Sequence, residues 1–364
     1  MKKLIFVICI LCFFSSLTFA SSGYFEPCSK NPYSIFYCST TNRIYHGCAG
    51  GENYRQLIIN DPLTLNEEKT YPVDGLIEGV VPIDNGNSIL VLIAEIDHQL
   101  GEDGVLRQIA YSDGHTENEF SFTTSPLGLV VDSQENYAYV SSGLAHQIID
   151  PIITKINLST WQKVGEDVKY GMFSYSLALT NDDSKLYVKN ERTVRIEKIG
   201  NYFKDFYEIG VFNTSNMAKL TPIEIEVCPA VIKMGFDNRL YVSSQALHEM
   251  ETPLLVIDTV TDIVTPLHYD NVSFWEMSLD TDNCKLYCVA YTKVINPYGG
   301  LPDYMPSNMV YQIDLENQYS FQVFIPAEEN IALIEAIPID DPNYSCRLFA
   351  TADKGKKVYY MDIQ

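Results

Sequence analysis

The 364-residue chain is poor in basic residues, with 25 Lys and Arg against 47 Asp and Glu and a formal net charge of −22. A surface with this charge repels nucleic acids and anionic membranes, so we expect no nucleic acid partner. After residue 20, no stretch approaches the roughly 20 consecutive apolar residues that a membrane-spanning helix needs. We therefore expect no transmembrane segment.

Several catalytic motifs are absent as well. The sequence has neither the Gly-x-Ser-x-Gly turn of serine hydrolases nor a glycine-rich phosphate loop, so it supports neither chemistry. No Cys-x-x-Cys pair occurs after residue 20, which argues against a zinc site built on cysteines. The enzymatic alternative that stays open relies on carboxylates and a metal ion.

The first 20 residues have the pattern of a secretory signal peptide. Lys2 and Lys3 precede an apolar run over residues 4–14, and small residues lead up to Ala20. We expect residues 1–20 to be removed, which lowers the net charge by a further two. Residues 21–364 would then be a soluble protein that is secreted, periplasmic or held at the cell surface.

Seven cysteines remain after residue 20, and export would permit them to form disulfides. An odd number leaves at least one unpaired within the chain. The three early cysteines are close enough in sequence to pair locally, but the sequence leaves the connectivity open. The seven are Cys28, Cys38, Cys48, Cys228, Cys284, Cys288 and Cys346.

An apolar pair, usually Tyr-Val, recurs along the chain at intervals of about 46 to 62 residues. A repeat of roughly 40 to 50 residues made of short strands is typical of propeller blades. Seven repeats predict an all-β, seven-bladed β-propeller of four-stranded antiparallel blades that forms one domain over residues 21–364. The residues that mark the repeats, called anchors below, are Tyr45, Val91, Tyr139, Tyr187, Tyr241, Tyr287 and Phe349.

Three of these repeats resemble the YVTN family of secreted and surface-layer β-propellers. The matching stretches are Tyr139-Val140-Ser141-Ser142, Tyr187-Val188-Lys189-Asn190 and Tyr241-Val242-Ser243-Ser244, and residues 256–262 match the third strand and following turn of that repeat. The resemblance implies a seven-bladed ring and leaves the ligand open. Lactonase-like propellers are a more distant resemblance.

The C-terminal blade lacks a fourth strand of its own. Residues 358–363 read as its third strand, and the segment Gly23-Tyr24-Phe25-Glu26 precedes the inner strand of blade one. We expect this N-terminal segment to pair with residues 358–363, because the pairing closes the ring and covers a sheet edge.

The loops between second and third strands share one face of a propeller, and such loops often carry function. Blade four is expected to turn tightly at residues 190–193. Blade six carries an insertion over residues 293–308, rich in Tyr, Pro and Gly, which favours an irregular loop with exposed aromatics. Tyr298 and Tyr304 in this loop are candidate ligand-binding residues, unless the insertion is only a tolerated surface loop.

Three histidines share one place in this pattern. His98, His146 and His248 each follow their anchor by seven residues, and Glu52 has the same offset in blade one. Imidazoles and a carboxylate on one face can bind a ligand or a transition metal, or exchange protons near neutral pH. The alternative is that they are remnants of the repeat at loop tips.

Three glutamates lie early in their blades, where the inner strands line the centre of the ring. Glu78, Glu276 and Glu335 could hold a divalent cation, calcium or magnesium, through oxygen ligands. Propeller lactonases use a metal in that position, which makes a metal-dependent lactonase-like hydrolase the main enzymatic alternative. Strand alternation could instead turn these side chains away.

We favour an exported, monomeric binding or interaction scaffold that is not an enzyme. Its loop face would contact an unknown protein, glycan or small-molecule ligand. The alternatives are the metal-dependent hydrolase and a structural surface protein.

Overall fold

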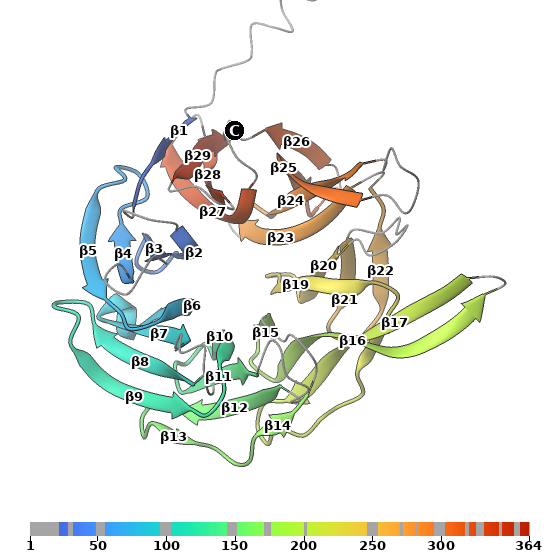
Figure 1. Ribbon diagram of the computed structural model, residues 1–364, viewed down its shortest axis with the longest axis horizontal. Coiled ribbons are helices and arrows are strands. Elements are labelled where there is room, and N and C mark those ends of the chain that lie inside the picture. The colour runs from blue at the N-terminus through green and yellow to red at the C-terminus, as the bar shows by residue number, and fades with distance from the viewer. Residues whose placement is uncertain are drawn as a thin grey trace, which may run out of the picture.

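The structure is a computed structural model of the chain, and its strands form seven antiparallel sheets arranged as blades around a central axis (Figure 1). It describes residues 22–27, 32–48, 55–94, 103–143, 151–170, 176–199, 202–245, 254–269, 272–280, 283–294, 303–316, 320–324, 331–341, 344–352 and 357–363. The prediction of an all-β, seven-bladed propeller with four-stranded blades is confirmed, and blade three has a fifth short strand.

Within each blade the strands follow one another from the ring centre outward. Blades one to three contain β2 (Pro32–Cys38), β3 (Arg43–Cys48), β4 (Gln56–Asn60) and β5 (Glu67–Pro72); β6 (Leu76–Ile83), β7 (Ser88–Ala94), β8 (Gly104–Ala110) and β9 (Thr116–Phe122); β10 (Pro126–Val131), β11 (Tyr137–Ser142), β12 (Ile152–Asn157), β13 (Gln162–Lys163) and β14 (Val168–Lys169). Blades four and five contain β15 (Leu177–Leu179), β16 (Lys185–Ile199), β17 (Tyr202–Asn213) and β18 (Ile223–Ile225); β19 (Cys228–Met234), β20 (Arg239–Gln245), β21 (Leu254–Asp258) and β22 (Val264–Leu267). Blade six contains β23 (Val272–Asp280), β24 (Lys285–Val294), β25 (Asp303–Asp314) and β26 (Ser320–Phe324); blade seven contains β27 (Ile331–Asp341), β28 (Tyr344–Ala352) and β29 (Val358–Ile363).

Every anchor lies on the second strand of its blade and is buried. The exposed fraction of these seven side chains does not exceed 2 %. Tyr187, for example, packs between blades four and five with Ile209 and Leu255. The sequence repeat therefore marks the layer where neighbouring sheets pack face to face, which is where apolar burial stabilises a propeller most.

The turns between third and fourth strands share one hydrogen-bonding pattern. Asp61, Asn157, Asn213, Asp258 and Asp314 each accept a backbone N–H two residues further on, at 2.9 to 3.0 Å. Short Asx side chains favour such turns because they replace a missing backbone partner. Asp and Asn serve equally well here, so the cap itself does not require a charge.

The N-terminal strand completes blade seven. β1 (Ser22–Phe25) pairs antiparallel with β29, with Tyr24 opposite Tyr359 and Phe25 opposite Val358, as expected from the sequence. The guanidinium of Arg347 on β28 donates to the backbone oxygens of Pro62 and Leu63 in blade one, both at 3.0 Å. Strands from both ends of the chain thus meet at one seam of the ring.

Blade four corrects one prediction. The expected tight turn at residues 190–193 is wrong, because β16 continues to Ile199 and returns as β17, with Ile199 opposite Tyr202. Figure 1 shows this hairpin projecting outward from the ring. Register shifts between Asn190 and Arg195 mark a bulge where the strand leaves the blade.

Blade six corrects a second prediction. The insertion over residues 293–308 was expected to be an irregular loop, but its two ends continue the strands β24 and β25. Val294 pairs with Asp303 and Lys293 with Tyr304. Hydrogen-bonded pairing therefore makes both ends of the insertion part of the sheet, and residues 295–302 lie outside the described residues.

Five of the described cysteines carry free thiols: Cys38, Cys228, Cys284, Cys288 and Cys346. Burial raises the pKa of the thiols of Cys228 and Cys346 to about 12, so these two are poor nucleophiles. Among the described residues, no helix is long and apolar enough to cross a membrane.

Candidate functional site

The residues that pair with the anchors form one layer of the inner strands. Because each inner strand pairs with a second strand in the same way, these residues occupy equivalent positions around the axis. In blades one to four they are apolar, and in blades five to seven they are polar. The layer consists of Phe36, Val80, Val130, Ala178, Lys233, Ser278 and Glu335.

The polar side of this layer is held together by hydrogen bonds between blades six and seven. The hydroxyl of Ser278 on β23 donates to Oε2 of Glu335 on β27 at 3.3 Å. The same hydroxyl accepts the backbone N–H of Ala336 at 2.9 Å. Ser278 thereby fixes the glutamate side chain relative to the neighbouring blade.

A bulge in β23 adds a second glutamate. Phe274 pairs with Ala290 and Met277 with Cys288, so Trp275 and Glu276 together oppose a single residue. Bulges redirect side chains and are often found beside functional sites. Oε1 of Glu276 accepts the backbone N–H of Met277 at 3.1 Å. We refer to Lys233, Glu276, Ser278 and Glu335 as the polar arc.

The two carboxyl groups of the polar arc favour their neutral forms. Burial raises the pKa of Glu335 to about 7, and the nearby charge of Glu276 raises it too, while Lys233 and the Ser278 hydrogen bond act in the opposite direction. Burial also raises the pKa of Glu276, against the attraction of Lys233 and Lys189. The arc therefore combines a lysine with two carboxyls, of which Glu335 can hold or release a proton near neutral pH.

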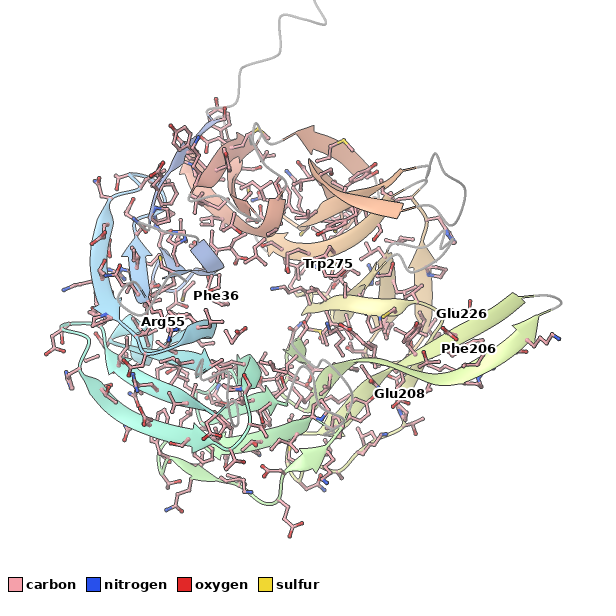
Figure 2. The ribbon with its side chains drawn as sticks, in the orientation of Figure 1. Phe36, Arg55, Phe206, Glu208, Glu226 and Trp275 are labelled. Carbon is pink, nitrogen blue, oxygen red and sulfur yellow. The ribbon has the colours of Figure 1, made fainter. Side chains whose placement is uncertain are left out.

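An exposed aromatic side chain adjoins the arc. Trp275 is 41 % exposed and stacks on Tyr291 of β24, with ring centroids 5.5 Å apart and planes inclined by 28°. Figure 2 places Trp275 and Phe36 beside the centre of the ring, on blades six and one. Polar groups on one side and aromatic groups beside them suit a small ligand with both polar and apolar faces.

Most of the loop residues named from the sequence cannot be placed. His98, His146, His248, Glu52 and Tyr298 lie outside the described residues. Tyr304 lies on β25 opposite Lys293, but its side chain is outside the described part of the chain. The proposed face of histidines and tyrosines stays a prediction.

The three glutamates named from the sequence are only partly brought together. Glu276 and Glu335 interact electrostatically, whereas Glu78 lies in blade two, at the bulge of β6 between Ile77 and Gly79. Within the described ranges, no group of three or more His, Cys, Asp or Glu side chains is placed to hold a metal ion. The described residues thus do not assemble the expected three-carboxylate site.

Lys233 and Ser278 were not found from the sequence. Nothing in their local surroundings marks them, since they lie on two different inner strands. Only their place in the repeat could have identified them, because Lys233 pairs with the anchor Tyr241 and Ser278 pairs with the anchor Tyr287.

Comparisons with known proteins support the fold alone. No family model and no curated protein sequence matches the chain. Many solved structures resemble it. One is the crystal structure of the Cps50 (Swd1) β-propeller domain of Myceliophteria thermophila, with a TM-score of 0.66 and 8 % sequence identity, covering 94 % of this chain and 100 % of that one. The chain is a β-propeller, and its resemblance to YVTN repeats rests on the strand motifs.

Proposed function

We propose that this protein is an exported binding scaffold that holds a small, partly polar ligand at the centre of its ring. The observation that carries the proposal is the composition of the inner layer, which is polar in three consecutive blades and apolar in the other four. A repeat that served packing alone would favour apolar residues at all seven positions.

Half-buried carboxyls with raised pKa values support a binding role. Keeping Glu276 and Glu335 in such surroundings costs stability, and residues of this kind gather at functional sites. The exposed face of Trp275 offers a ligand a stacking surface beside them.

Export is supported by the sequence of residues 1–20, which has the pattern of a signal peptide. Secretion, the periplasm and the cell surface are all compatible with it.

The metal-dependent hydrolase is the second candidate. It is favoured by the proximity of Glu276 and Glu335, since paired carboxylates attract calcium or magnesium. A hydrolase would need further ligands, and within the described residues no third His, Cys, Asp or Glu side chain joins these two in a metal-binding group.

Trp275 provides a direct test, because the chain has only two tryptophans. In a Trp161→Phe variant, Trp275 is the only fluorescent indole. Its emission and the melting temperature are followed after EDTA treatment, first with calcium, magnesium, manganese or zinc, and then with glucose, N-acetylglucosamine or spermidine. We expect at least one of these probes to change the Trp275 emission.

Three variants distinguish the outcomes. Glu276→Gln and Glu335→Gln should abolish the response, while Glu166→Gln, an exposed carboxylate on blade three, should leave it intact. A response to one ion together with a melting temperature raised by several degrees favours the hydrolase. If no probe alters either reading, the proposed central site is wrong.

A further inference from the structure

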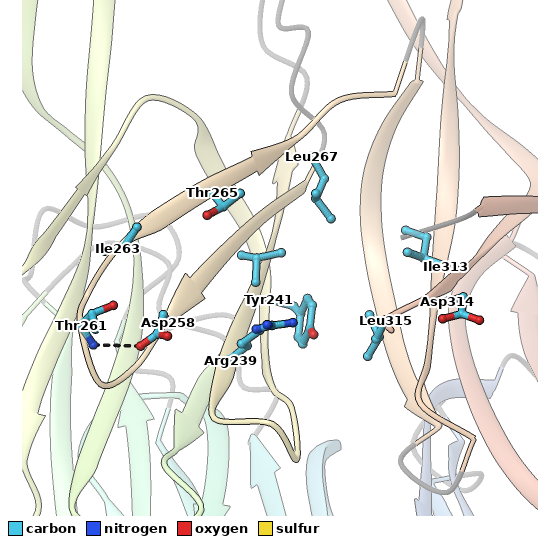
Figure 3. A pocket seen from close by; sticks show the side chains of 11 residues that line it. Arg239, Tyr241, Asp258, Thr261, Ile263, Thr265, Leu267, Ile313, Asp314 and Leu315 are labelled. Carbon is cyan, nitrogen blue, oxygen red and sulfur yellow. Dashed lines mark hydrogen bonds between the residues drawn. The ribbon is translucent and has the colours of Figure 1, made fainter. Parts of the chain in front are cut away.

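A groove runs between blades five and six, beside turns that face away from the second-to-third loops (Figure 3). One side is the β21–β22 hairpin of blade five, and the other is the end of β25 in blade six. The groove has a volume of about 220 Å³. It is separate from the polar arc, which lies on the inner strands of blades five to seven.

The walls of the groove combine apolar and polar side chains, with the apolar ones in a small majority. Val256, Ile263 and Leu267 contribute from blade five, and Ile313 and Leu315 from blade six. The exposed fraction of Ile263 is 62 %. Apolar side chains left in contact with water beside a groove mark a surface that a partner can cover.

The turn between β21 and β22 extends this apolar surface. Val260 in the turn is 77 % exposed, the highest value among the large hydrophobic residues that the structure describes. Val260 lies two residues after Asp258, whose side chain caps the turn by accepting the backbone N–H of Val260. Nothing in the fold of blade five requires an apolar residue at such a position, since turn residues of this kind are usually polar.

Negative charge surrounds the apolar walls. The carboxylates of Asp258 and Asp314 line the groove, and the one cation among its lining residues, Arg239, pairs with Asp237 at 3.3 Å and also attracts Asp258. In blade four the neutral side chain of Asn213 forms the same kind of cap that Asp258 and Asp314 form in blades five and six. The turns therefore do not require the negative charge of these two aspartates.

The pKa of the neighbouring thiol of Cys284 is also affected by negative charges in this region. Burial raises the pKa of Cys284, and the charges of Glu316, Asp314 and Asp237 raise it further. Of these carboxylates, that of Asp314 lines the groove. An acidic field of this kind attracts cationic groups and repels anionic ones.

The size of the groove limits what can enter it. Pockets for drug-sized ligands usually measure about 300 to 1,000 Å³, so about 220 Å³ accommodates one or two side chains. An extended peptide can insert such side chains while its flanking residues reach the acidic rim.

We infer that the groove between blades five and six binds a short extended peptide segment that inserts one or two apolar side chains flanked by lysine or arginine. The apolar walls take the inserted side chains, and the carboxylates of Asp258 and Asp314 attract the flanking cations. This adds a peptide-binding surface to the ligand site at the ring centre, and each can exist without the other.

Three fluorescein-labelled hexapeptides test the inference by fluorescence anisotropy: Gly-Arg-Leu-Phe-Arg-Gly, Gly-Glu-Leu-Phe-Glu-Gly and Gly-Arg-Ser-Ser-Arg-Gly. We expect the first to bind about tenfold more tightly than the other two, because only it combines apolar side chains with positive charge. Its affinity should fall as salt is raised, since the electrostatic part is screened.

Variants locate the binding on the molecule. Thr265→Trp places a large side chain in the groove and should abolish binding, whereas Thr116→Trp, an exposed threonine on the fourth strand of blade two, should not. Asp258→Asn with Asp314→Asn keeps both turn caps and should weaken binding several-fold. Undetectable binding of the basic peptide at millimolar concentration, equal binding of all three peptides, or binding that survives Thr265→Trp would each overturn the inference.

Discussion

The ring of Phe25 meets the imidazole of His46 edge to face, with centroids 5.5 Å apart and planes inclined by 74°. Phe25 lies on the N-terminal strand of blade seven, and His46 lies on β3 of blade one, so this contact crosses the seam where the ring closes. His46 is fully buried, and among the residues that the structure describes neither of its ring nitrogens has a hydrogen-bond partner. Such a histidine has to remain neutral in the folded protein.

Acid should therefore weaken the fold through His46. Burial lowers the pKa of His46 from about 6.5 to about 3, so below pH 6.5 the unfolded chain binds a proton that the folded protein excludes. The free energy of unfolding should decrease by roughly 2–3 kcal/mol between pH 7 and pH 4.5 from this residue alone. Urea unfolding at both pH values, for the wild type and His46→Leu, measures it.

The comparison needs a histidine that should not show this effect. His115 is exposed and pairs with Asp113 at 2.6 Å, and hydrogen bonding to Asp113 raises the pKa of His115. A His115→Gln variant should keep the acid sensitivity of the wild type. Parallel loss of stability in the wild type and His46→Leu would show that His46 does not cause it.

Glu335 should have the opposite dependence on pH. Because burial raises the pKa of Glu335 to about 7, the folded protein retains a proton that the unfolded chain has released above about 4.5. The free energy of unfolding should therefore decrease as the pH rises from about 4.5 to 7, because the unfolded chain loses this proton more readily than the folded protein. Glu335→Gln should be more stable than the wild type at pH 8, by on the order of 3 kcal/mol, and equally stable at pH 4. A variant less stable than the wild type at pH 8 would contradict the pKa.

The ion pair between Arg347 and Asp362 should be essential to the seam. Its two hydrogen bonds measure 2.5 and 3.0 Å, and both side chains are largely buried. Arg347→Met leaves the carboxylate buried without a partner and should cost about 3 kcal/mol in urea unfolding. The matched change Arg195→Met, on the exposed hairpin, should cost far less. Equal losses in the two variants would rule out a special role for Arg347.

The projecting hairpin of blade four should be dispensable for the fold. Arg195 pairs with Phe206 at its base, so residues 196–205 can be replaced by Asn-Gly without breaking the pairing within the blade. The melting temperature should change by no more than about 2 °C, because the hairpin lies outside the packed ring. A fall of 5 °C or more would show that the hairpin supports the blade.

Thiol labelling should give two different counts. In denaturant without reductant, N-ethylmaleimide should modify at least the five described cysteines that carry free thiols. In the native protein, Cys228, Cys288 and Cys346 should resist, because they are buried and burial raises their pKa values. Intact-mass spectrometry counts the adducts. Labelling of all five under native conditions would mean that the blades open readily.

The prediction from sequence succeeded where a residue's environment repeats in every blade. The buried tyrosines, such as Tyr139 and Tyr187, recur because each blade packs on the next in the same way. It failed for the blade-four hairpin, where charged residues such as Glu191 and Glu197 resemble a turn. No core demands an apolar pattern there, so a projecting strand and a polar loop look alike in the sequence.

The sequence by itself determined the number of blades, the second strand of each and the pairing of the first strand with the last. The first two features depend on local alternation of apolar and polar residues, and the pairing followed from the missing fourth strand of the last blade. Only the tertiary structure decided that Lys233, Glu276 and Glu335 share one side of the ring centre and that blades five and six leave a groove. The physical reason is that these side chains come from different sheets, so their proximity depends on how the blades pack and leaves no local pattern.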